Sequence, residues 1–354
     1  MVVSGYYGFG NAGDEMILSA LLRTLAGQDV TVLSADPAAT CADHGVAAVP
    51  RAAPGRVLRA LARCDLLVSG GGGLLQDATG PASVPYYLGL IAAARALGKP
   101  CMVYAQGIGP LRAGWARAAL RLLRGAAAVT VRDAESAELL ALAGVPNVEV
   151  TADAALSLPR PGAPACLPPE LGAVGIRGGD TILAIAPRPH PDPALTAGLA
   201  AAADTLASRL GARVVLVPMQ FPEDTAACAA VAAQMRRPPA ILVRRIAPAR
   251  YPGVFAGFHA VVAMRLHALI LATLAGVPAV GLTYDPKIQA FLRELGRPEA
   301  ELGLDATAAA IVERVEAVFP RSPATTAAVG AALDRLQALA RRNDEVLLTV
   351  LGRL

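Results

Sequence analysis

The chain has 354 residues, a length that suits two domains of about 150 residues each better than one. Hydrophobic residues make up 55% of it and charged residues 17%, a composition that excludes long disordered regions. Thirty-two basic and twenty-eight acidic side chains leave a net charge of +4. We interpret this charge as small and dispersed along the chain, so we expect no nucleic acid partner.

Cysteine usage and the first residues predict a cytoplasmic protein. The five cysteines are odd in number and form no Cys-x-x-Cys pair, a pattern typical of reduced thiols and not of a metal site. No basic segment precedes an apolar one at the start, so we expect no signal peptide. The apolar stretch 266–284 is long enough to raise the question of a membrane span, but it contains His267, Gly276 and Pro278. It therefore favours a buried helix followed by a buried strand.

In the first half, short apolar runs alternate with longer runs rich in Ala and Leu. This alternation predicts βαβ units and a parallel sheet with helices on both faces. The expected strands are residues 1–4, 30–33, 66–69, 100–105 and 129–132. The expected helices are residues 15–26, 84–97, 114–123 and 134–143.

The second half restarts the same pattern after a segment rich in proline and glycine. Residues 159–179 carry five prolines and five glycines without periodicity, which indicates a domain boundary. We therefore expect an N-terminal Rossmann-like domain at 1–160, a linker at 161–179, a second Rossmann-like domain at 180–322 and a closing helix at 323–354 that reaches back onto the first domain. The expected strands are residues 181–186, 213–217, 240–243, 260–263 and 279–282, and the expected helices are 194–210, 267–275, 288–295 and 323–353.

The phrase Gly-x-Pro recurs at 98–100, 144–146 and 276–278, each time between an expected helix and an expected strand. Glycine ends a helix in the left-handed conformation and proline prevents it from restarting. Because the phrase occurs in both halves, the two domains are expected to share an architecture. Two such domains facing each other predict a cleft, with sites at the carboxyl ends of the strands.

Glycine-rich loops follow three expected strands of the first domain. The loop at 4–15 brings Gly10, Asn11 and Asp14 to the start of a helix, where backbone N–H groups favour an anion. Residues 8–13 match G-x-G-x-x-G, but no acidic residue ends the second strand to bind a ribose. A required βα turn with Asp14 as helix cap is the alternative interpretation.

The other two loops are residues 70–73, which are four consecutive glycines, and Gln106-Gly107-Ile108-Gly109-Pro110. Such a glycine run indicates a backbone that must approach something closely, or else a flexible loop. Asp77 follows the run. Arg132 ends the next strand and either faces a ligand or pairs with Asp133 or Glu135. We expect these loops on the acceptor side of the cleft; the candidate residues are Gly10, Asn11, Asp14, Gly71, Gly72, Gly73, Gln106 and Arg132.

Cationic side chains end three expected strands of the second domain. Arg188 stands between two prolines, Arg265 and His267 begin a helix, and Lys287 follows Tyr284-Asp285-Pro286. Each feature alone is weak, since a lone histidine or arginine is more often structural. Together they predict one cationic pocket for a small ligand that carries both carboxylate and phosphate, with His267 left for proton transfer. No cluster of aspartates suggests a metal, so we expect no metal and no cofactor.

These motifs resemble those of the polysaccharide pyruvyl transferases, specifically the CsaB-type bacterial enzymes. The matching segments are residues 5–15, 69–77, 106–110, 131–136, 264–267 and 284–287, in the family's order across nearly the whole chain. The resemblance implies a GT-B-like fold and a metal-independent transfer from phosphoenolpyruvate that leaves a ketal-linked pyruvate on a sugar. It further implies N-acetylmannosamine of a lipid-linked precursor as acceptor, transient contact at the inner face of the membrane, and a wall polymer that anchors surface-layer proteins.

By position, the resemblance implies that Arg188 and Arg265 bind the donor's carboxylate and phosphate, with the main chain of Leu266 beside them. His267 is the expected acid that protonates the methylene carbon, and Lys287 is a further essential cation. Asp14 and Asp77 are the two candidate bases for the acceptor hydroxyl. Two other functions stay open: a sugar-nucleotide glycosyltransferase or epimerase of the same architecture, and a non-catalytic module that binds a sugar phosphate.

Overall fold

The computed structural model describes residues 1–78, 80–319 and 323–354. These residues separate into two compact units. The first unit is Met1–Leu158 together with Leu336–Leu354, and the second is Pro159–Arg335. The last helix, α14 (Pro323–Leu351), therefore starts in the second unit and ends in the first. The expected end of the second domain at residue 322 lies outside the described residues.

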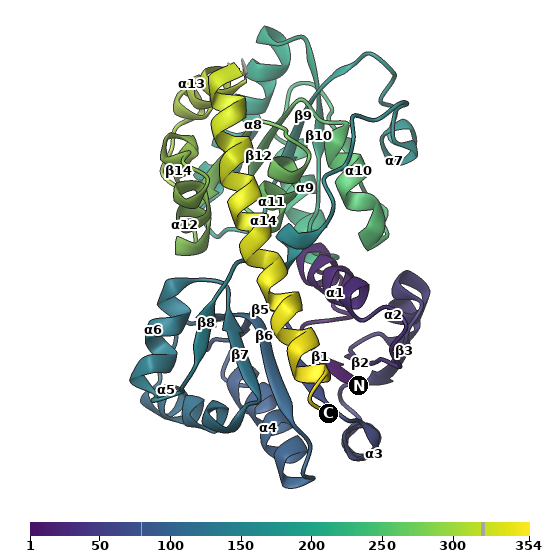
Figure 1. Cartoon of the computed structure of the whole chain (residues 1–354). Coiled ribbons are helices and arrows are strands. Elements are labelled where there is room, and N and C mark those ends of the chain that lie inside the picture. The colour runs from purple at the N-terminus through teal and green to yellow at the C-terminus, as the bar shows by residue number, and fades with distance from the viewer. Residues whose placement is uncertain (79, 320–322) are drawn as a thin grey trace. The chain divides into compact units, whose positions relative to one another are not determined.

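The first unit is built on an all-parallel sheet (Figure 1). Within the described residues it has eight strands in the order β3-β2-β1-β4-β6-β7-β8, and β5 also pairs with β6. The strands are β1 (Val2–Ser4), β2 (Thr31–Ser34), β3 (Ala47–Pro50), β4 (Leu67–Ser69), β5 (Gly72–Leu75), β6 (Cys101–Ile108), β7 (Ala128–Val131) and β8 (Val148–Val150). The order reverses next to β1, which is the switch point at which open α/β sheets bind ligands.

Helices cover both faces of this sheet. They are α1 (Ala12–Thr24), α2 (Pro37–His44), α3 (Pro54–Arg63), α4 (Ser83–Ala96), α5 (Gly114–Ala119) and α6 (Ala134–Leu142), with the 3₁₀ helices η1 (Leu120–Gly125) and η2 (Ala154–Ser157). Val103 of β6 belongs to the core shared with α3, α4 and η1. Its neighbour Tyr104 points to the opposite face, because side chains alternate along a strand, and donates a hydrogen bond to Asp344 of α14 at 2.6 Å.

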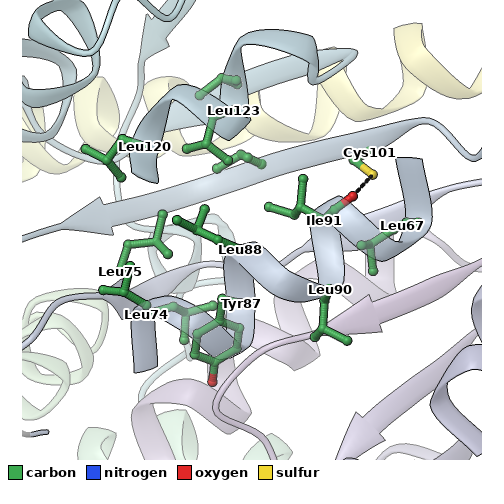
Figure 2. Close-up of a cluster of buried hydrophobic side chains, with 14 of the residues drawn as sticks. Leu67, Leu74, Leu75, Tyr87, Leu88, Leu90, Ile91, Cys101, Leu120 and Leu123 are labelled. Carbon is green, nitrogen blue, oxygen red and sulfur yellow. Dashed lines mark hydrogen bonds between the residues drawn. The ribbon is translucent and has the colours of Figure 1, made fainter. Parts of the chain in front are cut away.

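The core between the sheet and α4 is closely packed. Figure 2 shows Tyr87, Leu88 and Ile91 of α4 among leucines from the strands and from η1. Each of these three side chains is at most 2% exposed. The thiol of Cys101 on β6 donates to the carbonyl of Ile91 at 3.8 Å. Burial raises the pKa of this thiol to about 11, so it stays protonated and behaves as a small apolar side chain.

The second unit repeats the architecture with a six-stranded parallel sheet in the part that the structure describes, in the order β11-β10-β9-β12-β13-β14. Its strands are β9 (Thr181–Ala186), β10 (Ala212–Leu216), β11 (Ala240–Ile241), β12 (Ala260–Ala263), β13 (Ala279–Thr283) and β14 (Glu301–Gly303). Its helices are α7 (Pro169–Gly172), α8 (Pro193–Arg209), α9 (Glu223–Ala232), α10 (Tyr251–Ala256), α11 (Leu266–Leu274), α12 (Pro286–Glu294) and α13 (Ala308–Val318), with the 3₁₀ helices η3 (Pro248–Arg250) and η4 (Pro298–Ala300).

The predicted helix ends have the expected chemistry. Gly98, Gly144 and Gly276 have φ angles of 71°, 70° and 65°, the left-handed conformation that the Gly-x-Pro phrase predicts. The apolar stretch 266–284 forms α11 and β13, as expected. No helix in residues 1–78, 80–319 and 323–354 is long and apolar enough to cross a membrane.

The interpretation of residues 70–73 as a loop is wrong for the second half of that run. Gly72 and Leu75 begin and end β5, which pairs with Gln106 and Ile108 of β6. Leu74 and Leu75 are buried in the core. The carbonyl of Leu75 accepts from the N–H of Gly109 at 2.8 Å, and that of Leu74 accepts from Oγ of Ser83 at 2.8 Å. The glycine run therefore follows β4 directly, and its second half begins a short strand.

Candidate functional site

The carboxyl ends of three neighbouring strands gather the predicted donor residues of the second unit. Ala186 of β9 is aligned with Ala263 of β12, and Ala263 is aligned with Gly281 of β13. Arg188 and Arg265 each follow the aligned alanine of their own strand by two residues. Because parallel strands end at the same edge, the register alone places both arginines at one edge of the sheet. His267 in α11 and Lys287 in α12 begin the helices that leave this edge.

Arg188 is a half-buried cation held over an aromatic ring. Its guanidinium carbon lies 3.9 Å from the centre of the Tyr284 ring, a cation–π contact that orients the planar group. Within the described residues the side chain of Arg188 makes no ion pair, so its positive charge is not neutralised by a carboxylate. It stays available for an anionic ligand.

Arg265 is fixed by an aspartate that the sequence analysis missed. Asp224, in the first turn of α9, is fully buried and accepts from Nε of Arg265 at 3.0 Å and from Nη2 at 2.5 Å. The same carboxylate accepts from the backbone N–H groups of Met219 and Gln220. A bidentate pair of this kind sets the plane of the guanidinium. The only signal in the sequence is an acidic residue in the first turn of a helix, which is too common to single out.

Lys287 and His267 complete the set. Nζ of Lys287 lies 3.6 Å from Oδ2 of Asp285, whose Oδ1 caps α12 through the N–H of Lys287 at 3.1 Å. Asp285 thus positions the lysine and partly offsets its charge. His267 is the second residue of α11 and is half-buried. The two arginines are planar cations and Lys287 is a point-like one, so the three can bind an anion together. The imidazole of His267 lies at the same edge and can transfer a proton.

A cavity of about 220 Å³ lies beside Arg188. It is lined by Arg188, Pro187 and Met264 at the strand ends and by side chains of α8 and α9. Its walls are largely apolar apart from Arg188, His190 and Thr196. The cavity therefore adjoins the cationic edge of the second unit, and Arg188 forms the boundary between the two.

In the first unit, the loop between β1 and α1 is anchored by its own side chains. Oδ1 of Asn11 caps α1 by accepting from the N–H of Gly13 at 3.0 Å and of Asp14 at 3.4 Å. Glu15 accepts from the N–H of Gly8 at 2.8 Å and contacts Nε2 of His44 at 2.9 Å, with both side chains buried. Asn11 is thus a helix cap, and the loop is held in one conformation.

The glycines of this unit make room for buried side chains. The ring of Tyr7 lies against Gly5 and Gly70, and a methyl group on either glycine would collide with it. A methyl group on Gly72 would lie 2.7 Å from Oδ1 of Asp14. Asp14 is only 8% exposed. Burial, followed by the charges of Asp14 and Glu15, raises the pKa of Tyr7 well above its usual range, so its hydroxyl stays protonated.

Gln106 lies at an irregular point of β6. Ala105 has a φ of +46°, and the pairing of β6 with β7 shifts register between Val103 and Gln106. Such a bulge turns the next side chain. Nε2 of Gln106 donates to the carbonyl of Gly72 at 2.6 Å, while its buried Oε1 has no hydrogen-bond partner in the part of the chain that the structure describes. Gln106 therefore ties the glycine run to β6 and keeps one acceptor for a ligand or a water.

Arg132 and Asp77 are held by contacts inside the first unit. Nη1 of Arg132 lies 2.9 Å from Asp153, and its Nε lies 3.5 Å from Asp133. The side chain of Arg132 is buried and its charge is shared between the two carboxylates, which favours a structural role. Asp77 accepts from the N–H of Arg112 and of Ala113. The hydrogen bonds from Ala113 and then Arg112 lower the pKa of Asp77, which makes it a weaker base.

An aromatic cluster around Arg51 adjoins the same loop and was not singled out from the sequence. The guanidinium carbon of Arg51 lies 4.0 Å from the ring centre of Tyr86 and 4.9 Å from that of Phe9. Phe9 stacks on Tyr6 at 4.1 Å between centres. Because these residues come from three separated segments, no local pattern reveals the cluster. It fixes the loop of β1 to the start of α4.

The described residues offer no site for a metal ion. In the described ranges, no three His, Cys, Asp or Glu side chains are grouped so that they could hold a metal ion. The residues at the two sites are arginine, lysine, histidine, amide and isolated carboxylate groups. Such a set neutralises an anion through side-chain cations.

Solved structures similar to this chain share its fold at low identity. UDP-GlcNAc 2-epimerase from Neisseria meningitidis bound to UDP-GlcNAc has a TM-score of 0.65 and 10% identity, over 99% of this chain and 100% of that one. HepE from Anabaena in complex with UDP-glucose has a TM-score of 0.63 and 14% identity, over 99% and 97%. ADP-heptose LPS heptosyltransferase II from E. coli has a TM-score of 0.53 and 17% identity, over 90% and 98%. The chain thus has the GT-B-like α/β fold of these enzymes.

Comparison with protein families identifies the chain. No curated protein sequence matches it significantly. The family model for polysaccharide pyruvyl transferase matches residues 11–286, which is more than half of the chain. The match includes Asp14, Gln106, Arg188, Arg265 and His267, and ends one residue before Lys287. The chain therefore belongs to the polysaccharide pyruvyl transferase family.

Proposed function

We propose that this enzyme transfers pyruvate from phosphoenolpyruvate onto a sugar, forms a ketal and releases phosphate. The observation that carries the proposal is the alignment of Arg188, Arg265, His267 and Lys287 at one edge of the second sheet, in a member of this family. Phosphoenolpyruvate carries a carboxylate and a phosphate on the same carbon, C2, and it needs cations for both. Arginine forks suit these planar groups, and Lys287 supplies a point charge.

Proton transfer is the role proposed for His267. Donation of its proton to C3 of phosphoenolpyruvate forms a C–H bond and leaves an oxocarbenium-like C2. A sugar hydroxyl adds to C2 and loses its proton to a base. A second hydroxyl of the same sugar then displaces phosphate from C2 and closes the ketal. One of the two hydroxyl protons restores His267 and the other leaves with phosphate, so the reaction is balanced without a cofactor.

Arg188 and Arg265 would act by charge as well as by position. Phosphate gains negative charge as it leaves C2, and cations already in place stabilise that charge without reorganisation. Asp224 keeps Arg265 in its plane, and Tyr284 does the same for Arg188. The main chain of Leu266, between Arg265 and His267, is a further proposed donor contact.

Asp14 is our candidate for the base that accepts the proton of the acceptor hydroxyl. It is buried at the start of α1 and lies against Gly72. Asp77 is the weaker candidate because backbone hydrogen bonds lower its pKa. Gly10, Asn11, Gly71, Gly73 and the free acceptor of Gln106 are proposed to contact the sugar.

The acceptor proposed is N-acetylmannosamine in a lipid-linked precursor of a cell-wall polysaccharide. Similarity to CsaB-type enzymes supports this proposal, as it does the anchoring of surface-layer proteins by the finished polymer. A lipid-linked acceptor also means that the enzyme works at the inner face of the membrane. No metal or organic cofactor is required by the chemistry above.

The test follows phosphate release from phosphoenolpyruvate in the presence of acceptor. We expect release only when both substrates are present. In His267→Ala, we expect the Kd for phosphoenolpyruvate to change less than about threefold while turnover falls about 100-fold or more. Full activity of this variant would refute the acid role of His267. A non-catalytic binding module would bind phosphoenolpyruvate without release in either protein.

A sugar-nucleotide glycosyltransferase or epimerase is the second candidate, because the similar solved structures include enzymes bound to UDP-GlcNAc and UDP-glucose. At 10% to 17% identity this likeness concerns the fold. Turnover of a UDP-sugar together with no release of phosphate from phosphoenolpyruvate would favour this candidate and contradict pyruvyl transfer.

A further inference from the structure

The small net charge of the chain hides a strong segregation of charge. Residues 46–132 contain eleven Arg or Lys side chains and only two acidic ones, Asp65 and Asp77, so this segment carries +9. The whole chain carries +4, and the remainder therefore carries −5. No Asp or Glu occurs between Asp77 and Asp133. The charge is thus not dispersed, contrary to the expectation drawn from its total.

Most of these cations lie on one layer of helices in the first unit. Helices α3, α4 and α5 with η1 bury their apolar sides in the same core against the sheet. Figure 2 shows the part of this core that α4 and η1 form. Their exposed sides carry Arg56, Arg59 and Arg63 of α3, Arg95 of α4, Arg117 of α5, and Arg121 and Arg124 of η1. We call this set of exposed side chains the basic face.

The arginines of the basic face have few acidic partners. In the part of the chain that the structure describes, Arg56, Arg59, Arg63, Arg117 and Arg121 make no ion pair. The first three of these line an open cavity of about 530 Å³, which also includes Asp29 and Met1. Side chains of one sign left unpaired on neighbouring helices create a positive potential that an anionic surface would neutralise.

Large apolar side chains protrude from the same layer. Trp115 of α5 is 51% exposed, Leu122 of η1 is 40% exposed, and Leu97, just after α4, is 43% exposed. Trp115 is the only tryptophan of the chain. Nη1 of Arg95 donates to the carbonyl of Leu122 at 3.0 Å, and Nη2 of Arg124 donates to that of Ala143 at 2.6 Å. The segment that carries Trp115 and Leu122 is therefore held in place.

We propose that the basic face, with Trp115, Leu122 and Leu97, docks on an anionic lipid surface. Arginines beside exposed tryptophan and leucine match the two layers of a membrane interface, in which anionic headgroups lie outside the start of the acyl chains. A nucleic acid would use the arginines but offers no apolar layer for leucine side chains. Helix α5 follows the carboxyl end of β6, the strand of Gln106, so the docked face lies near the candidate acceptor residues.

This inference rests on the proposed function in one respect, because it gives the enzyme a surface near a lipid-linked acceptor. The observation that supports it is the distribution of charge. The test is co-sedimentation with vesicles of phosphatidylcholine alone or with added phosphatidylglycerol. We expect binding to the anionic vesicles, loss of binding at high salt, and a blue shift of Trp115 fluorescence on binding. Equal binding to both kinds of vesicle, or an unchanged Trp115 spectrum, would overturn the proposal.

Charge-reversal variants locate the surface. Arg117→Glu with Arg121→Glu should weaken binding to anionic vesicles at least about tenfold, and Trp115→Ala should weaken it as well. The matched control is Arg236→Glu with Arg237→Glu, which makes the same charge change on exposed residues of the second unit and should leave binding unchanged. Equal loss in the control pair would overturn the assignment. The lipid assignment would be overturned if Trp115→Ala bound anionic vesicles as tightly as the wild type does and the wild type bound RNA as tightly as it binds these vesicles.

The outcomes for membrane docking and for catalysis are separable. With a water-soluble acceptor, Arg117→Glu with Arg121→Glu should release phosphate from phosphoenolpyruvate at the wild-type rate. Vesicle binding without any phosphate release in the wild type would refute pyruvyl transfer alone. Phosphate release without vesicle binding would refute the docking surface alone.

Discussion

At the scale of single residues, the proposed donor chemistry depends on how each cation is held. Arg265 has a buried carboxylate partner that fixes its plane, whereas Arg188 has an aromatic ring and no carboxylate in the described residues. Arg265 is therefore the more rigid of the two side chains, and the charge of Arg188 is the more available for an anionic ligand. Asp224 touches no substrate in this account and acts as a positioning residue through Arg265.

Asp224→Asn tests this positioning. The amide keeps one acceptor for the backbone but loses the charge and the bidentate geometry, so we expect kcat/KM for phosphoenolpyruvate to fall about 100-fold. In an Arg265→Ala background the same change should add little, because the group that Asp224 positions is already gone. Glu223→Gln, on the adjacent exposed residue of α9, is the matched control and should behave as the wild type. Additive losses in the double variant would contradict the positioning role.

The two candidate bases should separate on substitution. Asp14→Asn is expected to abolish turnover, whereas Asp77→Asn is expected to keep it, because the carboxylate of Asp77 is engaged by the N–H groups of Ala113 and Arg112. A lowered pKa in the folded state means that ionised Asp77 stabilises the fold above the unfolded pKa of about 3.9, and that this contribution is lost as the pH falls through the folded pKa. Asp77→Asn should therefore lower Tm at pH 7, with the difference shrinking below about pH 4. Loss of turnover in Asp77→Asn alone would reverse the assignment.

At the scale of elements, the end of α14 is part of the first unit. Leu336, Ala340 and Leu347 are at most 2% exposed there. Asn343 is fully buried, accepts from Oγ1 of Thr151 at 2.8 Å and donates to the carbonyl of Ala152 at 3.1 Å. These contacts join residues about 190 positions apart in the sequence. They belong to the part of α14 that lies in the first unit.

Asn343→Ala is expected to lower the free energy of unfolding by about 1–3 kcal/mol, because the hydroxyl of Thr151 and the carbonyl of Ala152 are left buried without this partner. Chemical unfolding in urea measures the change. Arg341→Ala, on the exposed side of the same helix, is the control and should change stability by less than about 0.5 kcal/mol. Equal effects of the two variants would contradict the docking of this helix through Asn343.

Elements with strong periodicity could be predicted from the sequence, and elements made by tertiary contacts could not. Strand β9 and strand β12 have their expected bounds, since runs of buried β-branched and small residues between helices have few other interpretations. Strand β5 was missed because two of its four residues are glycine, which has a low strand propensity, and only pairing with β6 makes it extended.

The candidate site shows the same division. Arg188 and Arg265 could be placed at one edge because the rule for parallel strands needs only the strand ends. Asp224 could not, since it reaches Arg265 across 41 residues and through side-chain packing. The glycine run at 70–73 was interpreted as a place of close approach, but the neighbour of Gly70 is the ring of Tyr7, which also lies against Gly5. A sequence pattern shows that space is needed and does not show what fills it.

At the scale of the whole molecule, the chain has two parallel sheets with the same architecture. In the proposed function, the second unit supplies cations for a small anionic donor, and the first supplies glycine loops, Asp14 and Gln106 for a sugar. The same fold serves enzymes that act on nucleotide sugars. Fold alone therefore does not select the reaction; the side chains at the strand ends do.

Pyruvyl transfer would change the mass of the acceptor, which mass spectrometry measures. A lipid-linked or synthetic N-acetylmannosamine acceptor is incubated with phosphoenolpyruvate and the enzyme in a buffer containing a metal chelator. We predict that the acceptor gains one ketal-linked pyruvate, with one phosphate released for each, and that His267→Ala gives neither product. An unmodified acceptor, with a UDP-sugar consumed by the same enzyme preparation, would contradict this prediction.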